Sequence, residues 1–236
     1  MSSLTAPSPS SPTSPKITLT YFDFLGPTES IRLALTVSSY PFTDQLIPFP
    51  QWKSMKETKS NEVSTPWGQL PYMTLEFPGG RTEVVGQSSA ILRYVADLTG
   101  LTPLDRIVSL RNDEIIEYIN VDIKERKIYP TMRVEDEGER LKARKELNDS
   151  ILPAMFSKVV SKVPDGCAYL TGQKIATSDL VLYALCSWLG SGKLDGITEN
   201  VVLGNAWIKG HYERLCGNER IREWNEEKRK GRVPFF

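Results

Sequence analysis

The sequence predicts a mixed α/β domain followed by an all-α helical domain. Strand-like runs and a Gly-Gly turn occur before residue 98, and helical periodicity dominates the chain after it. At 236 residues the chain is long for one average domain and suits two. Its hydrophobic content of 40% is enough for packed cores. The boundaries that we expect are 17–98 for the first domain, 99–105 for a linker and 106–236 for the second domain.

A short tail is expected to precede the first domain. Residues 1–16 are rich in Ser and Pro and almost without apolar side chains, so they cannot bury enough surface to fold. They lack the apolar core of a secretory signal. They also contain no arginine, in which organelle-targeting segments are rich. We therefore expect a disordered tail on a cytoplasmic protein.

The first strand should be residues 17–22, followed by a loop over 23–29 and a helix that includes 30–35. Tyr21 then lies at the end of a strand and faces the entrance of a helix. By itself, a tyrosine in a strand is more often a core or surface residue than a catalyst, because strands favour aromatic side chains.

A strand, a hairpin and a second strand are expected over residues 70–86. Pro71 opens the first strand, where its missing N–H leaves no ladder bond unmade. If the Leu70–Pro71 bond is cis, the backbone of Leu70 is offered outward. A Pro-Gly-Gly turn at 78–80 separates this strand from the next apolar run.

Gln87 and Ser88 lie where the next helix begins. The apolar residues after them are spaced i, i+3, i+4, i+7, which is the helical pattern: Ile91, Tyr94, Val95 and Leu98. Taken alone, the Gln-Ser-Ser sequence is typical of simple helix capping. The free N–H groups of a helix start can equally hold a carboxylate, so a small anionic peptide is a second candidate.

Several motifs in this order resemble the cytosolic glutathione transferases. They are Tyr-Phe at a strand end, Glu29 in the first helical turn, Trp-x-x-x-Lys at 52–56, a Gln-Leu-Pro turn and Gln-Ser-Ser. The tyrosine-type classes fit best, with sigma nearest, and the resemblance covers about residues 17–230. It implies a thioredoxin-like first domain with the order βαβαββα, glutathione as co-substrate and a homodimer.

The resemblance also implies roles for individual residues. Tyr21 matches the catalytic tyrosine whose hydroxyl donates a hydrogen bond to the glutathione sulfur, which lowers the pKa of the thiol. The remaining matches are to glutathione-binding residues. Gln87 and Ser88 match the pair that binds the γ-glutamyl carboxylate, and Leu70 matches the residue that binds the cysteinyl part, with Gln69 and Pro71 beside it. Trp52 and Lys56 match the residues that bind the glycyl end. Glu117 matches an acid that binds the glutathione of the partner subunit.

An acid on a helix face is usually just solvated, so Glu117 has that alternative reading. The sequence also departs from the family pattern in two places. The loop that usually reads Arg-Gly-Arg has Leu25, Gly26 and Pro27, so two cations near the sulfur are missing and we expect weaker or shifted thiol acidification. The segment after Lys56 is longer than usual, so Lys53 or Lys59 could replace Lys56.

The acceptor is expected to be a small hydrophobic electrophile that binds between the domains, where small-molecule sites are common. Phe22, Phe24 and Leu25 are its expected walls in the first domain. Tyr118 is the candidate from the helical domain. The terminal Phe235 and Phe236 are further candidates, although they could equally be core packing or a frayed end.

The helical domain contains an apolar stripe over 147–163, which Pro153 is expected to kink, and its most apolar helix lies over 180–189. Asp179 is expected to serve folding at the start of that helix. The usual Ser or Thr cap three residues earlier is Ala176, although Thr177 could cap a helix that starts one residue later.

Composition and charge exclude several classes. The 29 basic and 29 acidic residues leave no surplus for nucleic acid, and no apolar run is long enough for a membrane span. The three widely separated cysteines suggest reduced thiols rather than a disulfide framework. The single histidine, His211, has no neighbouring ligands at metal spacing, so we expect no metal site.

The sequence therefore predicts a glutathione transferase that adds the thiolate to apolar electrophiles. A glutathione-dependent prostaglandin-type isomerase or a peroxidase would use the same first site, and the sequence does not separate them. A noncatalytic binding or structural module on the same scaffold also stays open, because fold alone does not settle function.

Overall fold

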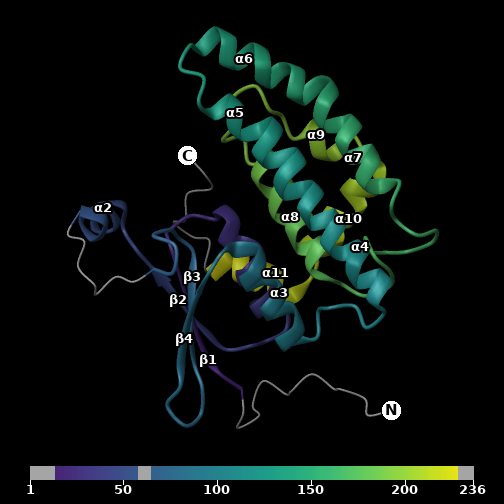
Figure 1. The fold of residues 1–236 in the computed structure, drawn as a ribbon. Coiled ribbons are helices and arrows are strands. Elements are labelled where there is room, and N and C mark those ends of the chain that lie inside the picture. The colour runs from purple at the N-terminus through teal and green to yellow at the C-terminus, as the bar shows by residue number, and fades with distance from the viewer. Residues whose placement is uncertain (1–13, 58–64, 228–236) are drawn as a thin grey trace. The chain divides into compact units, whose positions relative to one another are not determined.

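The computed structural model describes residues 14–57 and 65–227. Within that part of the chain, residues 14–102 and 223–227 form one compact unit, unit 1, and residues 103–222 form a second, unit 2 (Figure 1). The division falls inside the predicted linker. Each unit is described by itself below.

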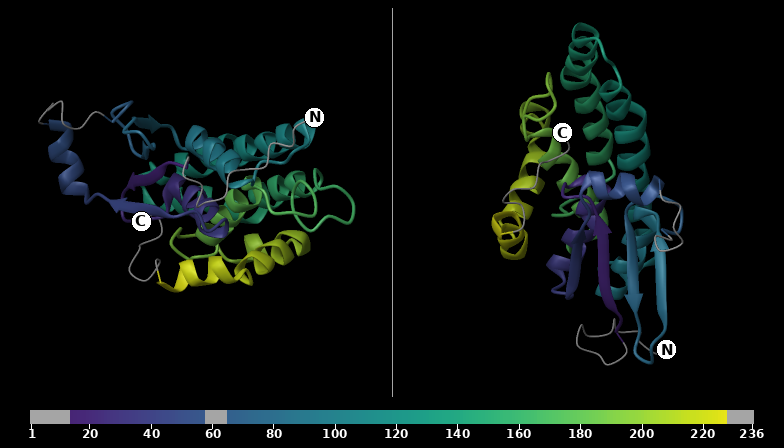
Figure 2. Two further views of the ribbon diagram at one scale, coloured as in Figure 1. Left: turned by 90° about the horizontal axis from the view of Figure 1, so that it is seen from below. Right: turned by 90° about the vertical axis from the view of Figure 1, so that its left-hand side faces the viewer.

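Unit 1 has the predicted order βαβαββα. A four-stranded sheet in the order β2-β1-β3-β4 is formed by β1 (Lys16–Tyr21), β2 (Phe42–Leu46), β3 (Tyr72–Glu76) and β4 (Thr82–Gly86). β2 runs parallel to β1, whereas β3 and β4 are antiparallel to their neighbours. The right-hand view of Figure 2 shows β1 in purple beside the β3–β4 hairpin. The helical elements are η1 (Gly26–Thr28), α1 (Glu29–Val37), α2 (Phe49–Glu57) and α3 (Ser88–Thr99).

The core of unit 1 lies between the sheet and the pair α1 and α3, which pack against each other. Alternate side chains of a strand point to one face. The inner face of the sheet accordingly carries Ile17, Leu19, Met73 and Leu75, and all four are buried. Each helix contributes an apolar stripe to the same core, as the sequence period predicts.

The strand register brings three chain segments to one edge of the sheet. Thr20 pairs with Tyr72, and Tyr72 pairs with Gly86. The residues that follow β1, precede β3 and follow β4 therefore lie side by side. This edge carries Tyr21, the Leu70–Pro71 bond and Gln87.

Two predicted boundaries of unit 1 are corrected by the structure. Lys16 already belongs to β1, and the carbonyl of the buried Pro15 accepts a hydrogen bond from the Tyr40 hydroxyl at 2.7 Å. The first domain therefore begins earlier than predicted, and residues 1–13 of the predicted tail lie outside the described part. At the other end of the chain, Trp224 donates to Glu29 Oε1 at 3.0 Å, so the last described residues belong to unit 1 and not to the helical domain.

Unit 2 is helical in its described residues, as predicted, apart from one isolated bridge between Tyr169 and Gly172. Its central helix α8 packs against α4, α9 and α10 (Figures 1 and 2). The bounds are α4 (Arg106–Glu117), π-helical η3 (Tyr118–Ile128), α5 (Tyr129–Met132), α6 (Glu137–Glu146), π-helical η4 (Leu147–Ile151), α7 (Leu152–Val160), α8 (Thr177–Leu189), α9 (Asn200–Leu203), α10 (Ala206–Cys216) and α11 (Glu219–Glu227), whose second half belongs to unit 1.

Pro153 does not lie inside a helix, where we expected a kink. It is the second residue of α7, directly after the π-helical turn η4. A proline is tolerated in the first turn because the N–H that it lacks has no partner within the helix.

The start of α8 has Ala176 as its N-cap residue and no side-chain cap of its own. Asn112 of α4 supplies the missing acceptor, because its Oδ1 accepts from the N–H of Ser178 at 2.9 Å. Its Nδ2 donates to the Thr177 hydroxyl at 3.0 Å, so Thr177 is held by Asn112 and does not cap the helix. The Asp179 carboxylate accepts from the N–H of Ala176 at 2.8 Å.

Asp179 has two further partners. Its Oδ1 accepts from the N–H of Leu170 at 2.9 Å and lies 2.9 Å from Nε2 of His211. Both Asp179 and His211 are fully buried. The carboxylate thus ties the loop before α8 and helix α10 to the start of α8, in agreement with a folding role.

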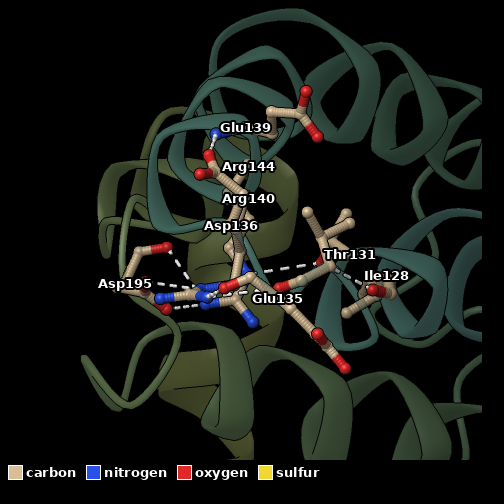
Figure 3. Close-up of polar contacts among 9 residues, drawn as sticks. Ile128, Thr131, Glu135, Asp136, Glu139, Arg140, Arg144 and Asp195 are labelled. Atoms are coloured by element: carbon tan, nitrogen blue, oxygen red, sulfur yellow. Dashed lines mark hydrogen bonds and ion pairs between the residues drawn. The ribbon is translucent and has the colours of Figure 1, made fainter.

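A second polar cluster holds α5, α6 and the loop before α9 together (Figure 3). The buried Arg144 forms an ion pair with Asp195 and donates to the Thr131 hydroxyl at 3.3 Å. Arg140 binds the same carboxylate at 3.2 Å. One aspartate therefore pairs with two arginines of neighbouring helical turns.

Candidate active site

Tyr21, the predicted catalytic residue, is the last residue of β1. Its side chain is only 4% exposed. The rings of Phe22 and Phe24 lie edge-on to it, with centroids 5.2 and 5.1 Å away. The loop after the strand thus packs around the phenol ring and limits its motion.

Arg32 holds this loop, and the sequence analysis did not single it out. Its guanidinium is fully buried and donates to the carbonyls of Phe24, Leu25 and Phe22 at 2.9, 3.4 and 3.3 Å. Its Cζ lies 5.9 Å from the centroid of the Tyr21 ring. The signal that could have revealed it is a charged residue inside the apolar run Ile-Arg-Leu-Ala-Leu, because a charge buried in a helix face needs fixed partners.

The charge of Arg32 does not replace the two missing loop cations. Its Nε lies 3.0 Å from Asp44 Oδ1, and Glu29 Oε2 lies 3.8 Å from its Nη1. Two carboxylates therefore balance one guanidinium. The loop positions 25 and 27 hold the uncharged residues Leu and Pro. Arg32 and its two carboxylate partners therefore add no net positive charge near Tyr21.

The expected acceptor walls of unit 1 differ in exposure. Leu25 is 8% exposed, so little of its side chain is available to a ligand. Phe22 and Phe24 are half-buried and stacked with centroids 5.3 Å apart. Phe22 also stacks on Phe49 of α2 at 4.6 Å. A layer of aromatic rings thus links the end of β1 to α2.

Trp52 and Lys56 lie one turn apart on α2. The Lys56 ammonium lies 5.6 Å from the Trp52 ring, and that ring lies 6.3 Å from Phe22. The aromatic layer therefore brings both residues to the side of the loop that follows Tyr21. Lys53 lies on the same helix and is also exposed, whereas Lys59 lies outside the described residues.

The turn before β3 contains a cis Leu70–Pro71 bond, the conformation that the sequence left open. Pro71 is buried, Leu70 is half-buried and Gln69 is exposed. β3 begins at Tyr72, one residue after Pro71, so the proline does not take part in the strand.

The start of α3 is not capped by a side chain, which excludes simple helix capping as the role of Gln-Ser-Ser. Gln87 is the N-cap residue and has φ 72° and ψ 106°. A residue with a side chain rarely adopts a positive φ, and such strain typically costs about 1–3 kcal/mol. Ser88 is the first helical residue. This helix start therefore presents uncapped N–H groups, and a strained backbone, at the sheet edge.

Glu117 and Tyr118 belong to unit 2. Glu117 is the half-buried last residue of α4, and Tyr118 is the first residue of η3. Burial raises the pKa of the Tyr118 hydroxyl, and the charge of Asp122 adds to that effect. Tyr118 lines a cavity whose other lining residues all belong to unit 2. Phe235 and Phe236 lie outside the described residues.

Within residues 14–57 and 65–227, no group of three or more His, Cys, Asp or Glu side chains is arranged to hold a metal ion. His211, the single histidine, is paired with Asp179 in the interior of unit 2. None of the helices in the described ranges has the length and apolar character to cross a membrane. All three cysteines are free.

No protein-family model matches the chain. Glutathione S-transferase 1 of Ascaris suum is 29% identical over 224 residues, covering 92% of this chain and 98% of the relative. The solved structure of prostaglandin synthase D of Nilaparvata lugens has a TM-score of 0.74 and 27% identity, covering 90% of this chain and 98% of that one. The sigma-class transferase of Fasciola hepatica also has a TM-score of 0.74, with coverages of 93% and 97%, and at 22% identity this likeness shows the fold alone.

Proposed function

Because this chain belongs to the cytosolic glutathione transferase family and is a transferase, we propose that it joins the thiolate of glutathione to an electrophilic carbon of an apolar acceptor. The proposal covers the acceptor class and the roles of individual residues. The observation that supports it most is the shared sheet edge of Tyr21, the cis Leu70–Pro71 turn and Gln87.

The dimensions of this edge suit a tripeptide. Neighbouring strands lie about 4.8 Å apart, so the ends of β1 and β4, with β3 between them, are separated by about 10 Å. Three extended residues span about 10 Å. A peptide whose γ-glutamyl end binds at Gln87 and Ser88 would therefore have its cysteinyl part near Leu70 and its thiol near Tyr21.

The two ends of glutathione are carboxylates, and the proposed partners have matching chemistry. Uncapped N–H groups at a helix start stabilise an anion through direct hydrogen bonds and the helix dipole. At the glycyl end, Lys56 is a flexible point charge beside the Trp52 ring. We prefer Lys56 to Lys53 because its ammonium lies against this ring.

The proposed chemical step needs a thiolate. A free cysteine thiol has a pKa of about 8.5, and a hydrogen bond donated by the Tyr21 hydroxyl favours the charged form. Leu25 and Pro27 replace the usual loop cations, and two carboxylates balance Arg32. We therefore expect Tyr21 to contribute most of the acidification and the thiol pKa to stay higher than in relatives with both arginines.

The test compares Tyr21→Phe with wild type in glutathione binding and in conjugation of chlorodinitrobenzene. We expect glutathione affinity to change little and the rate at neutral pH to fall by at least about tenfold, because the missing hydroxyl stabilises only the thiolate. Tyr40→Phe is the matched control, since it removes another buried hydroxyl of unit 1 that bonds to the Pro15 carbonyl. Equal rates for all three proteins would contradict the role of Tyr21.

A second measurement concerns the loop. Pro27→Arg should lower the apparent pKa of the pH–rate profile, because a cation near the sulfur favours the thiolate. An unchanged profile would count against electrostatic acidification at this position.

An isomerase is the second candidate, and the likeness to a prostaglandin synthase D at 27% identity is the observation that favours it. The fate of glutathione separates the activities. Conjugation consumes the thiol into a thioether, a peroxidase oxidises two thiols to a disulfide, and an isomerase returns glutathione unchanged. Binding without any turnover would instead indicate a noncatalytic module.

We also propose a homodimer, since members of this family are generally dimeric. Exposed apolar side chains at and before the start of α4 would be covered by a second copy, namely Leu104, Ile107 and Leu110. In such a dimer Glu117 would bind the partner's glutathione. Ile107→Asp should then shift sedimentation toward the monomer, and Glu117→Gln should weaken glutathione binding without changing sedimentation. A cytoplasmic location remains a prediction.

A further inference from the structure

Lys124 lies in η3, the π-helical stretch that follows α4 in unit 2. The N–H of Tyr129 donates to the Lys124 carbonyl, which is the hydrogen bond from residue i+5 to residue i that defines a π-helix. Residues four and five apart therefore share one side of this stretch. The Lys124 ammonium accordingly lies 3.0 Å from Oδ1 of Asn120. Because π-helical turns are frequent at functional sites, a lysine on this side is a candidate for chemistry.

The amine of Lys124 has no carboxylate partner within the part of the chain that the structure describes. Its hydrogen bond there is to the uncharged amide of Asn120. Of the acids beside it on η3, Asp122 is paired with Arg126 at 2.6 Å and Glu125 is exposed. Lys124 itself is half-buried. A lysine that is partly removed from water without a counter-ion is destabilised in its charged form.

The electrostatic surroundings of Lys124 favour the uncharged amine. Burial lowers the pKa of Lys124 to about 8, and the charge of Glu125 opposes this effect only in part. The following helix α5 contacts η3, and its titratable group, Tyr129, supplies no negative charge because burial raises the pKa of that hydroxyl to about 12. At about pH 7, roughly one Lys124 amine in ten is therefore uncharged, against fewer than about one in a thousand for an exposed lysine.

An uncharged lysine amine is a nucleophile, and lysines that are desolvated by their surroundings form imines with carbonyl compounds. From the position of Lys124 beside Asn120 on η3, half-buried and without a carboxylate partner, we propose that its amine binds a small uncharged aldehyde as a reversible imine. The partly buried position favours a small aldehyde. It also favours an uncharged one, because a charged aldehyde would lose hydration there. This activity goes beyond the proposed conjugation and needs no glutathione.

The covalent step is a condensation that needs no oxidant or reductant. The lone pair of the uncharged Nζ attacks the carbonyl carbon, the C–N bond forms, and the carbonyl π electrons move to the oxygen. A proton then passes from nitrogen to oxygen, which gives a carbinolamine. Cleavage of its C–O bond releases water and leaves the imine between Nζ and the former carbonyl carbon. Addition of water reverses the sequence and returns the free lysine and the aldehyde.

Hexanal is the probe, because it is a small saturated aldehyde without charge and without a second electrophilic carbon. The full-length protein is incubated with hexanal at about pH 7 without glutathione, and borohydride then reduces each imine to a stable secondary amine. Peptide mass spectrometry reports the modified fraction of each lysine. Lys124 should be modified at least about tenfold more than Lys127, an exposed lysine of the same stretch.

The pH dependence gives a second readout that accessibility alone would not produce. Incubation between about pH 6 and about pH 10, with reduction at one fixed pH, should give half-maximal modification of Lys124 near pH 8. Modification of the exposed lysines should still be rising at the upper end of this range. Equal modification of Lys124 and the exposed lysines, or a Lys124 profile that follows theirs, would overturn the proposal.

Two variants separate Lys124 from its neighbours. Lys124→Arg keeps a cation that stays protonated, so most of the hexanal incorporated at about pH 7 should be lost. Lys127→Arg is the matched control on the same stretch and should leave the incorporation unchanged. Equal incorporation in wild type and Lys124→Arg would contradict the proposal. Should Lys124→Arg fail to fold, the modified position and the pH profile of the wild-type protein still decide the outcome.

The result can be read independently of the transferase proposal. Tyr21→Phe should incorporate hexanal at Lys124 to the same extent as wild type, because glutathione takes no part in the reaction. A protein that neither binds nor conjugates glutathione would fail the transferase proposal and leave the hexanal result intact. A loss of Lys124 modification in Tyr21→Phe would overturn the present inference.

Discussion

The starts of α8 and α3 both lack a side-chain cap, and the surrounding structure treats them in opposite ways. At α8 the cap residue is Ala176, and at α3 it is Gln87. The N–H groups at the start of α8 are buried and receive acceptors from Asn112 and Asp179. Gln87 is exposed and has a strained backbone conformation, and the N–H groups that follow it are uncapped.

The difference shows how a similar local deficit can serve folding in unit 2, while in unit 1 we propose that it serves glutathione binding. A buried helix start must find partners within the protein, because an unpaired buried N–H costs about 1–3 kcal/mol. An exposed start can leave its N–H groups to water and exchange that water for a ligand carboxylate. Variants at the start of α8 should therefore change the free energy of unfolding, and variants at the start of α3 should change glutathione binding. The predictions below are ordered from the largest expected effect on stability to the smallest.

The largest effect is expected from Asp179→Ala. It leaves the N–H groups of Leu170 and Ala176 and the Nε2 of His211 without their acceptor, all in the interior of unit 2. The free energy of unfolding, measured by urea denaturation, should fall by about 3 kcal/mol or more. The exposed α6 cap provides the control, and Asp136→Ala should cost only about 1 kcal/mol. Equal losses would mean that burial does not set the cost.

Asn112→Ala should have the next largest effect. It removes the acceptor for the Ser178 N–H and the partner of the Thr177 hydroxyl, so unfolding should become easier by about 2 kcal/mol. Glutathione affinity should stay the same, because Asn112 belongs to unit 2 and the proposed peptide contacts within one chain come from unit 1. A stability within about 0.5 kcal/mol of wild type would show that Asn112 does not act as the cap.

Gln87→Gly should raise stability and lower binding at once. Glycine adopts φ 72° without the side-chain clash, which should stabilise the fold by about 1 kcal/mol. Loss of the amide side chain should weaken glutathione binding by about tenfold, as measured by calorimetry. Ser39→Gly is the matched control, since Ser39 also has a positive φ of 56°. It should gain similar stability with glutathione affinity unchanged.

Ser88→Ala should have the smallest effect on stability. The Ser88 side chain does not cap α3, so the free energy of unfolding should change by less than about 0.5 kcal/mol. Glutathione binding should weaken by about fivefold if the hydroxyl bonds to the γ-glutamyl carboxylate. Asn205→Ala provides the contrast, because Asn205 accepts from two N–H groups of α10 and its loss should cost about 1 kcal/mol.

Much of unit 1 could be predicted from its sequence. Tyr21 ends a strand and Ser88 begins a helix, as the apolar patterns indicate, and Pro71 lies one residue before the strand that it was expected to open. The resemblance to a known family then singled out these residues among many similar ones. Strands and helices of this length are specified by local periodicity and by Gly and Pro, which is why their order was predictable.

Other features could not be predicted because their partners are distant in sequence. Trp224 binds Glu29, which moves the last described residues out of the helical domain that the sequence predicted. Tyr118 lines a cavity of unit 2 with residues of α7, and its expected place in the acceptor pocket stays a prediction. Neither contact leaves a signal in the spacing of apolar residues.

The sequence by itself determined the order of the elements and the residue types at the end of each strand, because backbone sterics and apolar periodicity act over a few neighbours. Only the tertiary structure decided which helix start is buried, which loop Arg32 holds and that Asn112 replaces the missing cap. Those outcomes depend on whether a polar group is removed from water and on which distant side chain is then close enough to pair with it.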